Sequence, residues 1–436
     1  MQTSTQQQLN EKIRTKTIRA GIIGLGYVGL PLAVEFARAG VEVIGIDIDS
    51  KKVTSVQQGK SYILDVKESD VATFVKREKL HATTDFSVIA NLDTVNICVP
   101  TPLRKSKDPD ISYIVAATQE IAKYVHPGML IILESTTYPG TTEEVILPML
   151  EEKGLKVGKD FFLAFSPERV DPGNPKYHTG NIPKVVGGVT KECTELAAAF
   201  YGLVMDTVCR VKSASSAEMV KLLENTFRSV NIGLVNELCQ MCAKMNLDVW
   251  EIIDAASTKP FGYMPFYPGP GIGGHCIPLD PHYLAWKARS YGFAPRFIEL
   301  ASEVNESMPE FVVRKAQDVL NEKGRALKGA NVRILGVTYK KNISDQRESP
   351  AHSIIEILLK KGAYVSCSDP FVPEYQVEDK SFKSLPVDEQ SKDVDLAILV
   401  TDHDQFDKQK LLDTFKTILD TRNAFRDNPS AKVVKI

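Results

Sequence analysis

Residues 24–29 read Gly-Leu-Gly-Tyr-Val-Gly and decide the fold of the first part of the chain. They follow an apolar stretch of strand length at 17–23 and open a helical pattern at 30–39. In such a turn the first glycine permits the bend, the second lets a pyrophosphate approach the backbone, and the third lets helix pack on strand. Free N–H groups at the helix N-terminus then face the phosphates. The expected contacts are Gly24, Gly26, Tyr27, Val28 and Gly29.

A carboxylate, Asp47, stands at the end of the next apolar run, residues 41–46. In that position it suits the ribose diol of a dinucleotide and repels a 2′-phosphate, which favours NAD over NADP. Lys51 and Lys52 lie close by and weaken the preference, and Lys52 is itself expected at the cofactor. We therefore expect NAD as the cofactor; the competing interpretation is a glycine turn that binds nothing.

Apolar runs and helical patterns alternate beyond this turn, which favours an α/β fold with a parallel, doubly wound sheet. Further strands are expected at 94–99, 129–133 and 162–165, and helices at 111–124 and 141–152. Near residue 210 the pattern becomes helical, with one long helix at 214–245, shorter ones at 248–257, 282–290 and 297–320, and an irregular Pro- and Gly-rich segment at 259–281. Alternation returns with strands at 332–337, 364–368 and 396–401 and a helix at 350–361. We expect two Rossmann-like lobes joined by a central helical domain.

The composition excludes several classes of protein. A chain of 436 residues with 43% hydrophobic and 25% charged residues predicts two or three globular domains. Its net charge of −2 offers no field for nucleic acid or a lipid surface, so the partner is expected to be a small molecule. The polar residues 1–18 are not expected to form a signal sequence, and the uncharged, apolar run at 20–34 is expected to be too short to span a bilayer.

The cysteines do not form a disulfide or metal pattern. There are 7, scattered along the chain, which predicts a reducing, cytoplasmic environment. Cys239 and Cys242 match C-x-x-C, but both lie in a helical pattern without a second pair, which favours core packing over zinc. No His and carboxylate cluster has metal-ligand spacing, so no metal is expected.

One cysteine, Cys276, lies in a glycine-rich stretch, with Asp280 four residues beyond it. A lone cysteine is more often a small buried hydrophobe. The glycines, however, would let a substrate lie against the backbone, and a thiolate is the nucleophile that can hold an aldehyde. The local sequence leaves both interpretations open.

Polar residues on the long helix and at strand ends complete the candidate set. Lys221 and Asn225 are four apart on the long helix and share a face. Their apolar neighbours favour a buried lysine over a solvated one. The ends of predicted strands, which face the ligand crevice in this fold class, carry Thr101, Thr136, Glu168 and Arg169. For each of these four alone, an ordinary loop residue is the favoured interpretation.

Taken together, these motifs resemble the UDP-glucose/GDP-mannose dehydrogenase family from about Arg19 onward. The matching stretches are GLGYVGLPLA (24–33), VPTP (99–102), ESTTYPGTT (134–142), FSPER (165–169), EMVKLLENTFR (218–228), GPGIGGHCIPLDP (269–281) and GVTYKKNISDQRESPA (336–351). The stretches at 134–142, DPGNP at 171–175 and 261–281 are most similar to the UDP-N-acetylglucosamine 6-dehydrogenase subgroup.

The resemblance implies oxidation of a sugar C6 alcohol to a carboxylate with two NAD⁺ in succession, for surface polysaccharide synthesis. Cys276 would capture the aldehyde, and Lys221 and Asn225 would stabilise the oxyanion. Asp280, with Lys221 and a water, would serve as acid and base. Glu168, and Thr136 through water, would assist thioester formation and hydrolysis.

The resemblance also implies ligand contacts and domains. Further cofactor contacts are expected from Thr101, Thr136 and Arg347. Substrate contacts are expected from Glu168, Arg169, Lys221, Asn225, Lys259, Tyr267, Gly273, Tyr339 and Lys340. The domains would be an NAD-binding domain at 1–209, a central dimerisation domain with the catalytic loop at 210–315, and a UDP-binding domain at 316–436. A homodimer, or a dimer of dimers, would form on the long helix.

Two alternatives stay open. A relative acting on UDP-N-acetylmannosamine or UDP-glucose would use the same residues for its chemistry. A non-catalytic NAD-binding sensor would need neither the cysteine nor the polar residues around it. The Pro- and aromatic-rich residues 260–270 can supply flat apolar walls for an acetamido methyl, which favours an acetamido sugar.

Overall fold

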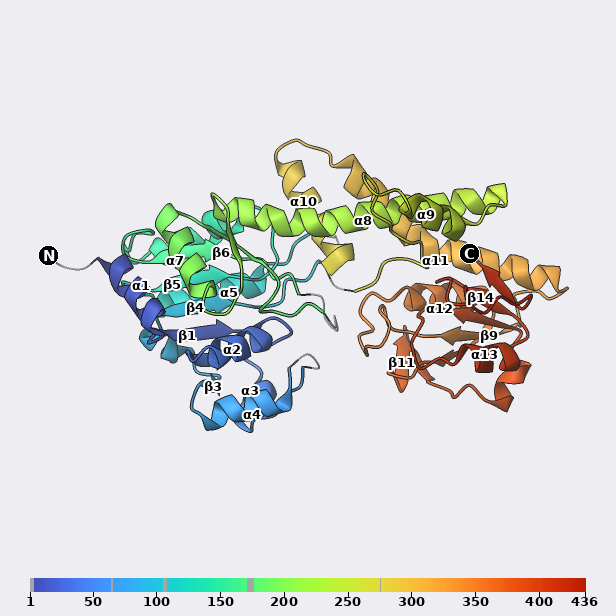
Figure 1. Ribbon diagram of the computed structural model, residues 1–436, viewed down its shortest axis with the longest axis horizontal. Coiled ribbons are helices and arrows are strands. Elements are labelled where there is room, and N and C mark those ends of the chain that lie inside the picture. Colours follow the sequence, from blue (N-terminus) through green and yellow to red (C-terminus); the bar gives the residue numbers. More distant parts are fainter. Residues whose placement is uncertain (1–3, 64–65, 105–107, 171–175, 275) are drawn as a thin grey trace. The chain divides into compact units, whose positions relative to one another are not determined.

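The computed structural model describes residues 4–63, 66–104, 108–170, 176–274 and 276–436, so the DPGNP stretch at 171–175 lies outside the described residues. The chain divides into two compact units (Figure 1). Unit 1 holds Met1–Glu224 and His282–Phe293, and unit 2 holds Asn225–Pro281 and Ala294–Ile436. Two helices, α8 (Ala214–Met245) and α10 (Cys276–Ser290), contribute residues to both units.

Unit 1 is built on a twisted sheet with the strand order β3-β2-β1-β4-β5-β6-β7-β8. The strands are β1 (Arg19–Ile23), β2 (Glu42–Ile46), β3 (Leu80–Thr83), β4 (Thr94–Ile97), β5 (Leu130–Leu133), β6 (Phe162–Phe165), β7 (Lys184–Gly188) and β8 (Val208–Arg210). All neighbouring strands run parallel except β6 and β7. The order reverses beside β1, which is the switch point where this fold class binds nucleotides.

Helices cover both faces of this sheet. They are α1 (Thr5–Thr15), α2 (Gly29–Arg38), α3 (Ser50–Gln57), α4 (Glu68–Lys76), η1 (Phe86–Asn91), α5 (Ser112–Tyr124), η2 (Thr141–Ile146), α6 (Leu147–Glu151) and α7 (Lys191–Tyr201). Successive strand residues enter separate cores: Ile22 packs in the core that includes α2 and α7, and Ile23 in the core that includes α5. A sheet buried on both faces explains why its strands read as continuous apolar runs.

Unit 2 contains a second parallel sheet, with the order β10-β9-β13-β14-β15, and a small antiparallel hairpin. Its strands are β9 (Asn331–Leu335), β10 (Tyr364–Ser368), β11 (Glu374–Val377), β12 (Lys380–Lys383), β13 (Leu396–Leu399), β14 (Ile418–Asp420) and β15 (Val433–Lys435). Its helices are α9 (Val249–Ser257), α11 (Arg296–Glu322), α12 (Pro350–Lys360), η3 (Glu389–Asp393) and α13 (Lys408–Thr414). The expected fold class, two Rossmann-like lobes with a helical segment and one long helix between them in the chain, is confirmed.

The structure corrects the sequence prediction at three places. The irregular segment predicted up to Pro281 ends earlier, because α10 begins at Cys276. Pro278 lies in the first helical turn, where its missing N–H removes no intrahelical bond, whereas Pro281 lies inside the helix. The helix predicted from residue 141 opens with a π-helical segment. Strand β7, which was not predicted, pairs antiparallel with β6, whereas a parallel sheet was predicted.

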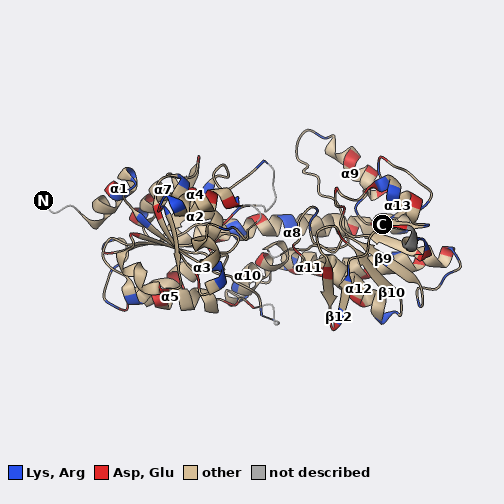
Figure 2. Ribbon diagram, turned by 90° about the horizontal axis from the view of Figure 1, so that it is seen from below, with Lys and Arg blue, Asp and Glu red and all other residues tan. Residues whose placement is uncertain are grey.

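Lys and Arg residues are interspersed with Asp and Glu along the elements of both units (Figure 2). This distribution accompanies a net charge of only −2. Across the described residues, none of the helices combines the length and the apolar character needed to cross a membrane.

Candidate active site

The glycine turn after β1 has the geometry that a pyrophosphate requires. Gly24 has a φ of +94° and its N–H donates to the Ile46 carbonyl at 2.7 Å. A Cβ at Gly29 would lie 1.9 Å from the Gly24 carbonyl oxygen, so helix α2 can approach the turn only with glycine there. A Cβ at Gly26 would meet no atom within 4 Å, which leaves open space over this part of the backbone. Both observations fit a bound dinucleotide.

Asp47 links this turn to the end of β2. Its Oδ2 accepts the Leu25 N–H at 2.8 Å and lies 3.3 Å from the Lys52 ammonium. Its Oδ1 accepts the Asp49 N–H at 2.9 Å and keeps a lone pair for a ribose hydroxyl. The predicted cofactor residues at this turn therefore lie together in unit 1, and Tyr27 is exposed beside them.

A buried cation, Lys184, holds two carboxylates beside the carboxyl ends of β5 and β6. Its ammonium lies 2.6 Å from Glu134 Oε2 and 3.6 Å from Glu168 Oε2. Glu134 Oε1 accepts further hydrogen bonds from Asn96, at 2.9 Å, and from Tyr201. Burial alone would lower the pKa of Lys184, but the two carboxylates outweigh it and raise that pKa above its usual value. Lys184 is therefore charged.

Two residues of α8 bind the segment after β6. The Lys221 ammonium donates to the Glu168 carbonyl oxygen at 2.6 Å, and Lys221 is buried. Glu168 Oε1 accepts the N–H groups of Arg169 and Val170. The Arg169 guanidinium pairs with both carboxylate oxygens of Glu224, at 3.3 and 2.6 Å. The structure thus brings together the predicted residues Lys221, Glu168 and Arg169.

The segment after β5 is also tied to α8, through Glu218. This fully buried carboxylate accepts the N–H of Gly140 and, at 2.9 and 2.7 Å, the N–H and hydroxyl of Thr142. Burial raises the pKa of Glu218 to about 7, although the three hydrogen bonds oppose the shift. Thr136 lies half-buried a few residues before Gly140. Thr101, also in unit 1, is held at its carbonyl by the Tyr283 hydroxyl at 2.7 Å.

In unit 2 the start of α10 carries the predicted nucleophile. Cys276 is the first residue of this helix and its side chain is exposed. One turn later, Asp280 is 2% exposed and its Oδ2 accepts a hydrogen bond from the Asn225 amide at 2.5 Å. A helix N-terminus stabilises negative charge, which suits a cysteine that reacts as a thiolate.

The glycines before Cys276 pack against the segment after β9. A Cβ at Gly273 would lie 2.4 Å from Tyr339 Cβ, and the Gly274 N–H donates to the Arg347 carbonyl at 3.1 Å. Tyr339 and Gly273, both predicted at the substrate, are therefore neighbours. The Arg347 guanidinium pairs with the Asp345 carboxylate, with its closest contact at 2.6 Å.

Two further predicted substrate residues contact elements of unit 2 itself. The Lys259 ammonium lies 5.2 Å from the centre of the Phe261 ring. The Tyr267 hydroxyl donates to Asp254 at 2.8 Å, and its ring stacks on Trp250. The Tyr267 hydroxyl is thus hydrogen-bonded to a residue of α9.

Comparison with known proteins matches three family domains to the chain. The NAD-binding, central and UDP-binding domains of the UDP-glucose/GDP-mannose dehydrogenase family match residues 18–204, 215–307 and 333–427. The chain belongs to this family. It is an NAD-dependent nucleotide-sugar dehydrogenase, and the prediction of NAD as cofactor is confirmed.

Relatives in the family carry different substrate names. A UDP-N-acetyl-D-glucosamine 6-dehydrogenase of Pseudomonas aeruginosa is 36% identical over 82% of this chain and 84% of its own length. A UDP-N-acetyl-D-mannosamine dehydrogenase of Methanococcus maripaludis is 33% identical over 93% of both chains. The solved structure of a UDP-D-ManNAc dehydrogenase from Pyrococcus horikoshii superposes with a TM-score of 0.87 at 31% identity, covering 96% of this chain and 98% of its own.

Sequence reasoning missed two of the residues that organise the dehydrogenase site in unit 1. Lys184 is the first residue of the sequence Lys-Val-Val-Gly-Gly. A charged residue at the start of a buried strand was the feature of the sequence that could have identified it. In the sequence Glu218 looks like an ordinary helix residue. Its role is visible only from its hydrogen-bond partners, which lie 76 and 78 positions away in the chain.

We expect Lys184→Met to lower the free energy of unfolding by about 3–5 kcal/mol, because it leaves the Glu134 carboxylate buried without its cation. The matched control is Arg210→Ala, which removes the ion pair with Glu195, whose two side chains are 50% and 49% exposed. That variant should lose only about 0–1 kcal/mol. Urea denaturation of both variants and the wild type at pH 7 measures the difference. Equal small losses would contradict a structural role for Lys184.

Proposed function

We propose that the protein oxidises C6 of UDP-N-acetylglucosamine to the carboxylate. Each sugar consumes two NAD⁺ and one water and releases two NADH. The observation that carries the proposal is the exposed Cys276 at the start of α10, one turn before the buried Asp280–Asn225 pair. A sensor that only bound NAD would need none of these three residues.

In this proposal Cys276 attacks the aldehyde formed by the first oxidation. The resulting thiohemiacetal is oxidised to a thioester, which water then hydrolyses to the carboxylate and the free thiol. Lys221 and Asn225 stabilise the negative charge that develops on the sugar oxygen, because fixed donors act most strongly where charge appears. Asp280, with Lys221 and a water, takes the proton of the C6 hydroxyl.

Glu168 and Thr136 assist the hydrolysis of the thioester in this proposal. Lys184 lies 3.6 Å from the Glu168 carboxylate and holds this side chain in place. NAD, held by the glycine turn and by Asp47, supplies the electron acceptor for both oxidations. Tyr339 and Lys340 contact the uridine side of the substrate.

The choice of sugar rests on two kinds of support. The motifs at 134–142 and 261–281 are most similar to the glucosamine subgroup, and relatives from Pseudomonas aeruginosa and Salmonella typhi carry that name. Phe261 and Tyr263 remain exposed, so their rings are free to pack against an acetamido methyl. UDP-N-acetylmannosamine, named for other relatives, is the second candidate.

We expect UDP-N-acetylglucosamine to give two NADH per sugar and UDP-glucose to react much more slowly. One buried methyl-sized group is worth about 1–3 kcal/mol, or roughly 10- to 200-fold in kcat/KM. Absorbance at 340 nm with UDP-N-acetylglucosamine, UDP-N-acetylmannosamine and UDP-glucose on one preparation makes the comparison. A preference for the manno epimer would overturn the choice of epimer alone, and a preference for UDP-glucose would overturn the acetamido argument.

We expect Cys276→Ser to abolish steady-state production of the uronate. An alcohol is a far poorer nucleophile than a thiolate at neutral pH, so the second oxidation loses its covalent intermediate. Product analysis together with NADH counting measures the effect, and binding of NAD serves as the control for folding. Turnover at the wild-type rate would refute the role of Cys276.

We further propose a homodimer built on α8. This helix leaves large apolar side chains exposed: Met219, Leu223, Phe227, Leu234, Met241 and Met245. Such a row of apolar side chains is typical of a surface that packs against another chain. Light scattering at micromolar concentration should give at least twice the chain mass of 48.2 kDa. A monomeric mass would contradict the proposal.

A further inference from the structure

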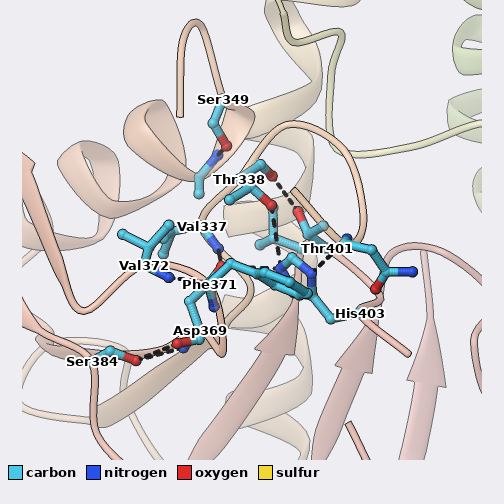
Figure 3. Close-up of polar contacts among 12 residues, drawn as sticks. Val337, Thr338, Ser349, Asp369, Phe371, Val372, Ser384, Thr401 and His403 are labelled. Carbon is cyan, nitrogen blue, oxygen red and sulfur yellow. Dashed lines mark hydrogen bonds and ion pairs between the residues drawn. The ribbon is translucent and has the colours of Figure 1, made fainter. Parts of the chain in front are cut away.

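A buried imidazole–carboxylate pair lies in the UDP-binding domain, and neither of its members has been assigned a role above (Figure 3). His403 is 1% exposed and Asp369 is 7% exposed. The His403 Nε2 lies 3.0 Å from Asp369 Oδ2. The rings of Phe371 and Phe406 pack against the imidazole. A buried pair of this kind needs an explanation, because apolar residues of the same size would be less costly to bury.

The hydrogen bonds fix the tautomer of His403. The backbone N–H of Asn342 points at Nδ1 from 3.0 Å, and since an N–H can only donate, Nδ1 carries no proton. The proton is therefore on Nε2, which donates to Asp369 and lies 3.2 Å from the Thr338 hydroxyl. Burial would raise the pKa of Asp369, but the bonds it accepts outweigh this and hold the pKa below its usual value. Asp369 is an ionised acceptor that orients a neutral imidazole.

Asp369 occupies the position in unit 2 that Asp47 occupies in unit 1. Asp47 follows the second strand of its sheet and accepts the Leu25 N–H from the turn after the first strand. Asp369 follows β10 and accepts the Val337 N–H, at 2.7 Å, from the turn after β9. In unit 1 the Asp47 carboxylate keeps a lone pair for a ligand. In unit 2 the corresponding position at Asp369 is occupied by the His403 side chain of the same protein.

The segment that His403 holds carries the proposed uridine contacts. It runs from Thr338 to Asn342, whose φ is +63°. The Thr338 hydroxyl donates to the Lys340 carbonyl at 2.8 Å. The same hydroxyl lies 3.2 Å from His403 Nε2 and the Asn342 N–H donates to Nδ1, so both ends of the segment contact the imidazole. Tyr339, in its centre, packs on Gly273 and Gly274, the glycines before Cys276.

We propose that His403 is a positioning residue of the nucleotide-sugar site. Its unprotonated Nδ1 fixes the backbone of Asn342 and thereby holds Tyr339 and Lys340 in place for the uridine diphosphate. Through Tyr339 the same bond supports the glycine stretch that leads to the nucleophile. This inference rests on the proposed function, since it assigns the bound group to that site.

The test compares two variants of His403. Each replacement keeps a polar atom near one ring nitrogen of the imidazole and loses the bond made by the other nitrogen. In His403→Asn the side-chain oxygen stands near the former Nδ1 and can accept the Asn342 N–H. In His403→Gln the amide reaches Asp369, but the Asn342 N–H is left unpaired. Calorimetric titration with UDP should show His403→Gln weakened by about tenfold or more, and His403→Asn by less than about threefold. Titration with NAD should give the wild-type dissociation constant for both variants, because the glycine turn and Asp47 lie in unit 1.

Each other outcome decides against the inference. Wild-type UDP affinity in His403→Gln, or equal losses in both variants, would show that the Nδ1 acceptor does not position the segment. Should both variants fail to fold, hydrogen exchange of the Asn342 amide in the wild type decides: the bond to Nδ1 should slow the exchange, and exchange as fast as that of an exposed loop amide would overturn the inference. Failure of the wild type to bind UDP would instead refute the proposed function itself.

Discussion

The ion pair between Lys184 and Glu134 is the interaction on which the candidate site residues of unit 1 depend. Both side chains are almost fully buried, and a carboxylate left alone in such a place would cost several kcal/mol. Lys184 lies at the start of β7, whereas Glu134 and Glu168 follow β5 and β6. One cation thus joins the segments that carry the proposed Thr136 and Glu168. Lys221 adds α8 to the same cluster through the Glu168 carbonyl.

The local part of this arrangement could be predicted from the sequence, and the long-range part could not. Strand spacing and the glycine fingerprint predicted the fold class and NAD because both signals lie within about thirty residues. Asp47 was found for the same reason. Lys184 pairs with a residue 50 positions away, and His403 with one 34 positions away, so no local pattern marks them. The start of α10 at Cys276 could not be predicted, because the stretch around it is rich in glycine and proline, which favour irregular structure.

The two lobes repeat one backbone device. In each, a glycine with positive φ ends the first strand, Gly24 at +94° and Gly336 at +80°. Its N–H bonds to the end of the second strand, and the next N–H bonds to the aspartate there, at 2.8 Å in unit 1 and 2.7 Å in unit 2. The aspartate satisfies an N–H that the turn would otherwise leave unpaired near the sheet edge. Fold class alone therefore accounts for a carboxylate at this point in both lobes.

What differs is the use of the remaining lone pairs. Asp47 Oδ1 accepts one N–H and has room for a ribose hydroxyl, whereas both oxygens of Asp369 accept two bonds each. A ribose hydroxyl would therefore have no acceptor at Asp369. The position that corresponds to the proposed ribose site at Asp47 is occupied in unit 2. His403 occupies this position through Nε2. Its other ring nitrogen, Nδ1, accepts the Asn342 N–H and so holds residues 338–342 in place. The bond from His403 to Asp369 therefore has two effects. It fills the position at which a ligand hydroxyl could bind Asp369, and it orders residues 338–342, which are proposed to contact the uridine side of the substrate.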